Sequence, residues 1–374
     1  MSAGTDVGTP TDAAGGLSTA AGIGARRAFV APLAAVAGAL LLGTLIMIVC
    51  GISPAEAYPA LLQGAIGEGN LPYTVAALVP TLGMAIAFAI PFRMGEFNLG
   101  GDGQLALGGV VTAAVALRLP LPAGLGLVVP LLAGAVAGAL VAAIAAPLHS
   151  RLGIPAIVTT LLLSTPAVAL ASYLARFPLA EKGSGVPQTE VLPDASHLPA
   201  LGGSEYVTIA LPLMIVLCAL WLWFDSSSVI GFRVRSAGAN REFARYGGVD
   251  VGRLTLGTLA VSGGLAGLVG GMVVMTTPFR FIDAALTSPG WTFTGIAAVL
   301  LAAGRPFAVP VTVVLLTVLQ VGGEGMERDA DVPRQLTQVI EGLVIVLVAV
   351  TATAHRWPDW WGRLRRRRGK EAAA

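Results

Sequence analysis

The chain has 374 residues, of which 55% are hydrophobic and only 12% charged, and its mean hydropathy is +0.79. Soluble domains carry about 25% charged residues, so the composition excludes an ordinary soluble protein and predicts an all-α, polytopic membrane protein. The net charge of +2 does not indicate nucleic-acid binding, because the basic residues lie beside apolar segments, where membrane orientation explains them. Two cysteines in apolar segments predict neither a disulfide framework nor a metal site.

The N-terminal residues 1–25 are rich in Ser, Thr, Gly and Ala without apolar periodicity, and we expect a disordered cytoplasmic tail there. Arg26 and Arg27 then precede an uncharged run from Ala28 to Ala55. Ala55-Glu56-Ala57 resembles the cleavage site of a signal peptide, but the run is longer than an h-region of about 7–15 residues. The run is therefore predicted to be a retained first membrane helix.

About ten apolar segments approach the length of roughly 20 residues that a membrane core of about 30 Å requires. They form a predicted transmembrane domain over residues 26–354, and a basic cytoplasmic tail follows over 355–374. Pairs of glycines four residues apart, such as Gly134 with Gly138 and Gly263 with Gly267, predict close helix packing. The predicted spans are approximately 28–55, 71–91, 103–118, 124–147, 155–175, 206–224, 254–276, 291–304, 306–322 and 335–354.

The span at 291–304 is short, and the segment before it is irregular. Residues 277–290 contain Pro278, Asp283 and Pro289. Non-helical backbone at membrane depth is tolerated only where it is buried in protein or lines a cavity. The segment is therefore predicted to be re-entrant.

The distribution of basic residues predicts the orientation, because cytoplasmic loops carry the excess of Lys and Arg. With both termini in the cytoplasm, all but six of the 23 lysines and arginines fall on the cytoplasmic side. The six are Arg118, Arg176, Lys182, Arg280, Arg328 and Arg334.

The long basic interruption between apolar segments runs over residues 225–253 and contains five arginines. Within it, residues 235–249 are predicted to form a short helix between glycine breaks, since Gly238 and Asn240 can end or redirect a helix. A positive-inside topology signal is the simpler interpretation, but the bounded helix favours a docking segment. Its arginines would offer charge to an acidic rim, and its aromatic residues would supply apolar anchors. The predicted docking residues are Arg235, Gly238, Asn240, Arg241, Phe243, Arg245 and Tyr246.

A second polar motif lies between two apolar runs, at residues 93–109. Glycines at 100, 101 and 103 would interrupt a helix, which predicts a broken helix near 96–104. Transporters use such helices to present polar groups to their cargo. A tight cytoplasmic turn between two spans is the alternative. The residues assigned to the substrate pathway are Glu96, Phe97, Asn98, Asp102 and Gln104.

Enzymatic activity is not expected. The chain has no G-x-x-x-x-G-K-[ST] phosphate loop, so it carries no P-loop ATPase of its own. Its three histidines are scattered, and neither G-x-S-x-G nor H-E-x-x-H occurs.

Three stretches together resemble the permease subunits of ABC importers, in the superfamily shared by nucleoside, simple-sugar and branched-chain amino acid systems. Residues 97–105 (F-N-L-G-G-D-G-Q-L) are similar to the F-N-I-G-x-E-G-Q pattern of the nucleoside-type branch. Residues 235–249, with the glycine-rich stretch at 262–271, look like the R-A-x-G-x-N-x-x-A-A-R-x-x-G-I … S-G-x-L-A-G-L-A-G stretch. The third stretch is 295–304 with 332–343, and the resemblance covers about 71–354.

The resemblance implies a permease that translocates a nucleoside-like polar solute, delivered by an external substrate-binding lipoprotein. Residues 235–249 would be the coupling helix that docks to a separate cytoplasmic ATPase. That ATPase would bind ATP and Mg²⁺, and this chain would bind no cofactor. Gly103-Gln104 resembles the longer of two paired permeases, which implies a heterodimer in a bacterial plasma membrane. Asp102 stands where the family more often has Glu, a change that bears on the exact cargo more than on its class. Because the binding protein holds most of the specificity in this family, purine derivatives, riboflavin and simple sugars stay open as cargo.

A secondary transporter driven by protons or sodium is the alternative from another class. It would need an intramembrane carboxylate as its coupling site. The candidates are Glu96, Asp102, Asp283 and Glu341. A purely structural membrane component is disfavoured, because a scaffold does not need the glycine-rich polar motif.

Overall fold

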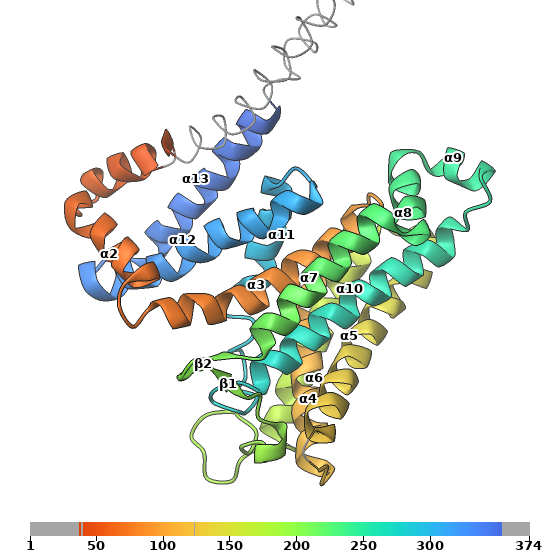
Figure 1. The fold of residues 1–374 in the computed structure, drawn as a ribbon, viewed down its shortest axis with the longest axis horizontal. Coiled ribbons are helices and arrows are strands. Elements are labelled where there is room, and N and C mark those ends of the chain that lie inside the picture. Colours follow the sequence, from red (N-terminus) through yellow and green to blue (C-terminus); the bar gives the residue numbers. More distant parts are fainter. Residues whose placement is uncertain (1–36, 39, 123, 354–374) are drawn as a thin grey trace, which may run out of the picture. The chain divides into compact units, whose positions relative to one another are not determined.

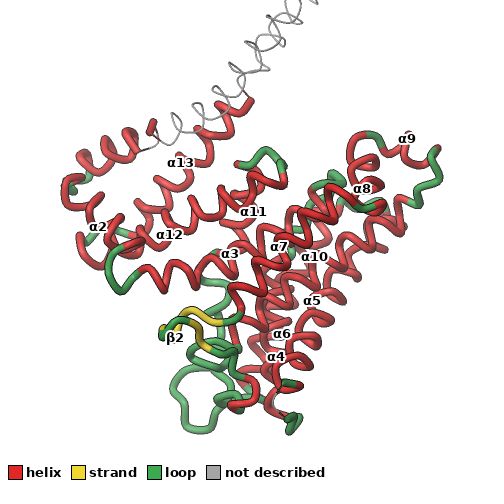
Figure 2. The backbone as a smooth tube through the Cα atoms, viewed as in Figure 1, coloured by secondary structure: helices red, strands yellow, loops and turns green. Residues whose placement is uncertain are grey.

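The computed structural model describes residues 37–38, 40–122 and 124–353, so the predicted tails over 1–25 and 355–374 lie outside the described residues. Helices dominate the described chain, and the strands form one small hairpin (Figures 1 and 2). The all-α prediction is confirmed in this sense. The chain divides into two compact units, a smaller one of Met1–Pro54 with Gln335–Ala374 and a larger one of Ala55–Arg334.

In the smaller unit, the apolar helix Leu40–Val49 lies against α13 (Arg334–Thr353). A Cβ added at Gly43 would stand 2.9 Å from Cγ1 of Ile340. Gly43 therefore lets these two helices approach closely, as small residues do between membrane helices.

The larger unit contains eleven helices labelled in Figure 1, two 3₁₀ turns and a hairpin within its described residues. Their bounds are α2 Pro54–Ile66, α3 Leu71–Phe92, α4 Gly101–Arg118, α5 Leu125–Leu152, α6 Ala156–Arg176, η1 Asp194–Ser196, β1 Ala200–Leu201, β2 Ser204–Thr208, α7 Ala210–Ser227, α8 Val229–Ala239, α9 Arg241–Tyr246, α10 Val251–Val274, α11 Trp291–Leu301, η2 Pro306–Ala308 and α12 Val309–Ala330.

Six helices in the described chain are long and apolar enough to cross a membrane. The helices Leu40–Val49 and α11 are apolar but shorter. The protein is therefore a membrane protein with several spanning helices, while the predicted count of about ten is not established. The six are Leu71–Phe92, Leu125–Leu148, Ala156–Arg176, Ala210–Ser227, Val251–Val274 and Pro306–Ala330.

Helices α4, α5 and α10 pack against one another in the larger unit (Figure 1). Glycines occupy the crossing points: a Cβ on Gly108 would collide with Gly267 of α10, and a Cβ on Gly138 of α5 would collide with Gly263. In a membrane, helix association depends on close van der Waals packing, because lipid offers no hydrophobic drive. The close packing predicted from the glycine pairs is thus confirmed.

The segment 277–290 has no helix, in agreement with its predicted irregularity. Its backbone is bound to the loop that follows α6, since the Thr189 amide donates to the Phe281 carbonyl at 2.9 Å. Asp283 accepts hydrogen bonds from Ser172 of α6 at 2.6 Å and from Nε of Arg176 at 2.9 Å. The segment is therefore a fixed loop on the end of α6, and its depth in a membrane stays a prediction.

Candidate functional site

The polar motif forms a short non-helical connection, residues 93–100, which we name the α3–α4 link. Helix α3 ends at Phe92, Gly95 adopts φ +79° in the turn that follows, and α4 begins at Gly101. The predicted break near 96–104 is confirmed over 96–100, whereas residues 101–104 are helical. The link joins two separate helices, α3 and α4, and the alternative of a tight cytoplasmic turn between two spans stays a prediction.

The structure brings the side-chain amides of Asn98 and Gln104 together in the interior, where these residues are 4% and 1% exposed. The Asn98 Nδ2 group donates to Gln104 Oε1 and to Ser262 Oγ, both at 2.8 Å. In the other direction, Gln104 Nε2 donates to Asn98 Oδ1 at 3.0 Å. The Gly100 amide donates to the same Asn98 oxygen at 3.0 Å. The two amides therefore hold the link on α10 and on the first turn of α4.

The glycines of the motif allow close packing at the start of α4. A Cβ added at Gly101 would stand 2.6 Å from Cγ2 of Thr292 on α11. One added at Gly103 would stand 2.7 Å from Cα of Ser164 on α6, whose hydroxyl accepts a hydrogen bond from the Gly103 amide at 2.9 Å. These glycines thus let α6 and α11 touch α4, rather than unwinding it as predicted.

The remaining pathway residues lie in different surroundings. Phe97 is half-buried and packs on two rings of α3, those of Phe88 at 6.0 Å and Phe92 at 5.5 Å between ring centroids. Asp102 is half-buried in the first turn of α4, where the helix dipole favours a carboxylate. Within the described chain, its carboxylate has no ion pair.

Glu96 connects the pathway motif to the predicted docking segment. The residue is 5% exposed, and its carboxylate forms an ion pair with the guanidinium of Arg241, the first residue of α9. The side chain of Arg241 remains 43% exposed. This ion pair therefore joins one residue of the predicted substrate pathway to one residue of the predicted docking segment.

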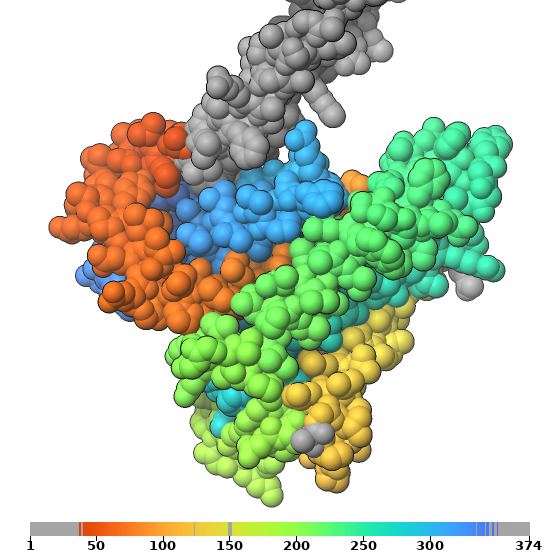
Figure 3. Space-filling model, viewed as in Figure 1, coloured from red at the N-terminus to blue at the C-terminus, as the bar shows by residue number. Residues whose placement is uncertain are grey.

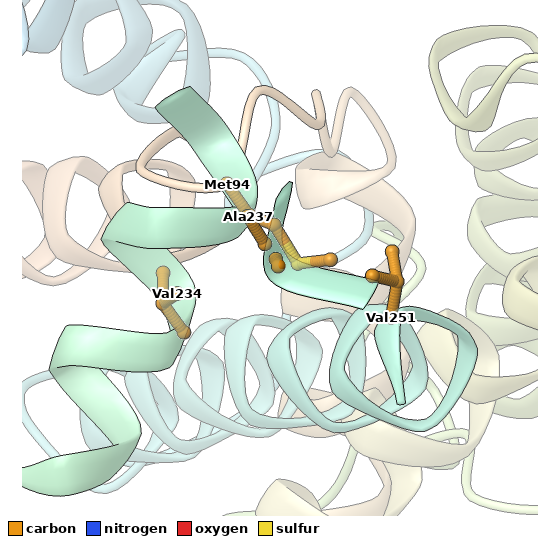
Figure 4. Close-up of a cluster of buried hydrophobic side chains, with 5 residues drawn as sticks. Met94, Val234, Ala237 and Val251 are labelled. Carbon is orange, nitrogen blue, oxygen red and sulfur yellow. The ribbon is translucent and has the colours of Figure 1, made fainter. Parts of the chain in front are cut away.

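Neighbouring link residues reinforce this connection. Met94 is 1% exposed and fills an apolar cluster with Val234 and Ala237 of α8, Ala244 of α9 and Val251 of α10 (Figure 4). The link therefore supplies part of the apolar core that α8, α9 and α10 share.

Arg93 anchors the start of the link to the end of α7. Its Nε and Nη2 atoms donate to the two carboxylate oxygens of Asp225 at 2.9 and 3.0 Å. A Cβ on Gly238 would collide with the Arg93 carbonyl, so the end of α8 lies directly on the link. The sequence alone did not point to Arg93, Met94, Asp225 and Ser262 as site residues. The one available signal was the opposite charge of Arg93 and Asp225 at the ends of two apolar runs, which is consistent with an ion pair.

The docking segment consists of two helices that meet at Asn240. Asn240 ends α8, and its Oδ1 accepts from the Phe243 amide at 3.0 Å to cap α9. The short helix predicted within 235–249 is present as α9, which begins after the predicted break at Asn240 and ends at the predicted glycines 247–248. It is shorter than 235–249, because residues 235–239 belong to the separate helix α8.

The predicted docking residues divide into inward and outward groups. Phe243 and Tyr246 are 68% and 91% exposed, and the α8–α9 region projects from the larger unit (Figure 3). Arg245 is also exposed and pairs locally with Glu242 at 3.0 Å. Gly238 faces the link, and Nη1 of Arg235 lies 3.8 Å from Asp225 Oδ2.

Among the described residues, no group of three His, Cys, Asp or Glu side chains is placed to hold a metal ion. The two regions offer groups that can bind a ligand or a partner. Asp102 presents a half-buried carboxylate at the start of α4, and Phe243 and Tyr246 present exposed rings on α9, which is fixed to the link.

Residues 70–349 match the family described as the branched-chain amino acid transport system permease component. A glucose ABC transporter permease protein of Haloferax volcanii is 31% identical over 360 residues, 93% of each chain. A guanosine ABC transporter permease protein of Bacillus subtilis is 30% identical over 327 residues, 85% of this chain and 92% of that one. A nucleoside ABC transporter permease protein of Lactococcus lactis is 26% identical over 334 residues, 87% of this chain and 91% of that one.

Proposed function

This chain belongs to the branched-chain amino acid transport system permease family, and we propose that it is the permease subunit of an ABC importer for nucleoside-like solutes. Two of the three relatives carry guanosine or nucleoside in their names, and the third carries glucose. The observation that carries the proposal is the exposed aromatic pair of α9, Phe243 and Tyr246, on a helix ion-paired to the link before α4.

In this proposal α9 is the coupling helix and docks in a groove of a separate cytoplasmic ATPase. Exposed aromatic residues are the kind of anchor that dominates protein interfaces, and Arg245 adds charge for an acidic rim. ATP and Mg²⁺ bind to that ATPase. The face that carries α9 is then cytoplasmic, and we place both termini in the cytoplasm of a bacterial cell, with the chain in its plasma membrane.

The cargo-recognition group that we propose is Asp102. Ribose and glucose both present neighbouring hydroxyls, and an ionised carboxylate accepts hydrogen bonds from two of them. Glu96 is engaged with Arg241, while Asn98 and Gln104 bind each other. Asp102 is therefore the pathway carboxylate that is half-buried and outside any ion pair of the described chain.

The remaining parts of the importer are also proposed. A second, homologous permease would complete a heterodimer and share the pathway. A substrate-binding lipoprotein would deliver cargo to the opposite face. There the segment 277–290 is fixed to α6 by Asp283, and to the loop after α6 by the pair of Arg280 with Glu181 at 2.8 Å.

Reconstitution tests the function. The chain would be placed in proteoliposomes with the partner permease and ATPase, with the binding protein outside and ATP inside. We expect uptake of labelled guanosine that needs ATP and survives collapse of the proton gradient. Uptake of glucose but not guanosine would contradict the cargo, and uptake that needs the proton gradient and not ATP would contradict the ABC mechanism.

A further inference from the structure

We propose that Glu96 and Arg241 form the latch through which movement of α9 reaches the first turn of α4. Glu96 is then a positioning residue for energy coupling. It is not a cargo ligand, although its place in the motif predicts that it binds cargo. This inference rests on the proposed function, because it assumes that an ATPase moves α9.

The latch begins at the one ion pair of the described chain that joins α9 to a residue outside its own loop. The other ion pairs of α9 and of the first turn of α10 are local: Arg245 pairs with Glu242, three residues away, and Arg253 pairs with Asp250, also three residues away. Arg241 by contrast reaches a carboxylate 145 positions earlier. A pull on α9 is therefore transmitted to Glu96.

The ion pair resists opening because its carboxylate is buried. Glu96 is 5% exposed, so separating its carboxylate from the guanidinium of Arg241 would cost Coulomb energy in a medium of low dielectric. Arg241 carries five N–H donors on a planar group and is 43% exposed, so it can hold Glu96 while its outer edge faces a docked protein. The contact thus has an inner end fixed in the protein and an outer end available to a partner.

Only a short stretch of backbone connects Glu96 to the start of α4. Asn98 follows two positions later, and a chain spans at most about 3.6 Å per residue, so the two residues are at most about 7 Å apart along the backbone. Asn98 is bound on one side to Gln104 in the first turn of α4 and on the other to Ser262 of α10. A displacement of Glu96 therefore reaches α4, where Asp102 lies, within two residues.

The side of the link toward α3 is anchored separately. Arg93 is held by both oxygens of Asp225, which lies at the end of α7. With that side anchored, movement at Glu96 is directed toward Asn98 and α4. The link therefore has the geometry of a short lever between α9 and the proposed cargo group.

The test compares single and paired charge changes in the reconstituted importer, with uptake per ATP hydrolysed as the measurement. Arg241→Gln removes the latch, and the ATPase that co-purifies with this variant shows that the chain still folds. We expect about a tenfold lower ratio of cargo to ATP, within the usual range of coupling between sites, while the ATPase still co-purifies. Glu96→Gln should lower the ratio similarly, with the KM for cargo within about twofold of the unaltered protein.

The charge swap Glu96→Arg with Arg241→Glu should restore the ratio to within about threefold of the unaltered protein, whereas each single swap should not. Arg253→Glu is the matched control, because Arg253 is exposed and pairs only locally; it should leave the ratio within about twofold. A normal ratio in Arg241→Gln would overturn the latch, whatever the Glu96 variants do. A raised KM in Glu96→Gln that the swap does not rescue would instead make Glu96 a cargo ligand.

These outcomes are distinct from failure of the proposed function. If the unaltered complex takes up no cargo with ATP, the function is wrong. If it transports and all the latch variants do so equally well, only the latch is wrong.

Discussion

The side-chain amides of Asn98 and Gln104 hydrogen-bond to each other in both directions, at 2.8 and 3.0 Å. The motif predicts that these two residues bind cargo. Inside the protein, however, their side-chain amides bind each other, and Asn98 also donates a hydrogen bond to Ser262. The first role of the pair in this structure is to fix the entry into α4.

Asn98→Ala should destabilise the protein, because it leaves the buried Gln104 amide without its main partner. An unsatisfied buried polar group costs about 1–3 kcal/mol. Thermal unfolding in detergent measures the loss. Gln104→Ala and the double variant complete a cycle, and the double variant should lose clearly less than the sum of the two single losses. Additive losses would show that the two amides do not act as a pair.

Gly238→Ala should displace the end of α8 from the link, because the added Cβ would collide with the Arg93 carbonyl. Overpacking of this kind costs about 1–3 kcal/mol, and we expect a lower midpoint of thermal unfolding. Gly257→Ala is the matched control, since a Cβ there meets nothing within 4 Å and the position is helical. An equal effect of both substitutions would refute the specific contact.

Phe243→Ala together with Tyr246→Ala should abolish co-purification of the ATPase without reducing insertion of the chain in the membrane. Both rings are exposed, so their loss removes no internal packing, while interface anchors contribute about 2 kcal/mol or more each. Tyr173→Ala removes an exposed ring on α6 and serves as the control. If the double variant retained the ATPase at the usual yield, α9 would not be the docking helix.

Asp102→Asn should weaken cargo recognition, because the neutral amide loses the charge-assisted hydrogen bonds that a carboxylate makes with hydroxyls. We expect the KM for guanosine uptake to rise about tenfold, which corresponds to about 1.4 kcal/mol. Asp102→Glu keeps the charge and should retain most of the affinity. The KM is measured with purified binding protein at saturating ATP; an unchanged KM in Asp102→Asn would exclude this residue from the cargo site.

Acid should loosen the contact between α6 and the segment 277–290. Burial by itself raises the pKa of Asp283, but hydrogen bonds from Ser172 and Arg176 and the charge of Arg176 outweigh it, so the pKa lies below its ordinary value of 3.8. A carboxyl with a lowered folded pKa stabilises fully above the unfolded pKa, and this contribution is lost as the pH falls through the folded pKa.

Protease cleavage in the loop 177–208 should therefore stay slow at pH 5 and accelerate below about pH 3.8. Pepsin, which is active in acid, is the appropriate probe. Asp283→Asn removes the titrating group, so its cleavage should be faster at pH 5 and should show a smaller rise on acidification. Identical pH profiles for both proteins would disprove the role of Asp283.

Much of the architecture follows from local sequence. Apolar runs predict membrane helices because hydropathy belongs to each segment by itself, and six such helices are present in the described chain. The breaks at Asn240 and at 247–248 follow from capping and glycine chemistry within a few residues. The glycine pairs of α5 and α10 predict close packing, since only small residues allow helix backbones to touch.

The sequence by itself thus determined the membrane class, the family, the missing P-loop and the place of the two polar motifs. Only the tertiary structure decided how their side chains are used. It pairs Glu96 with Arg241 across 145 positions, binds Asn98 to Ser262 across 164, and turns Gly238 inward. The physical reason is range: hydropathy and capping act within one segment, whereas an ion pair or a buried hydrogen bond forms only between atoms that helix packing brings within about 3 Å.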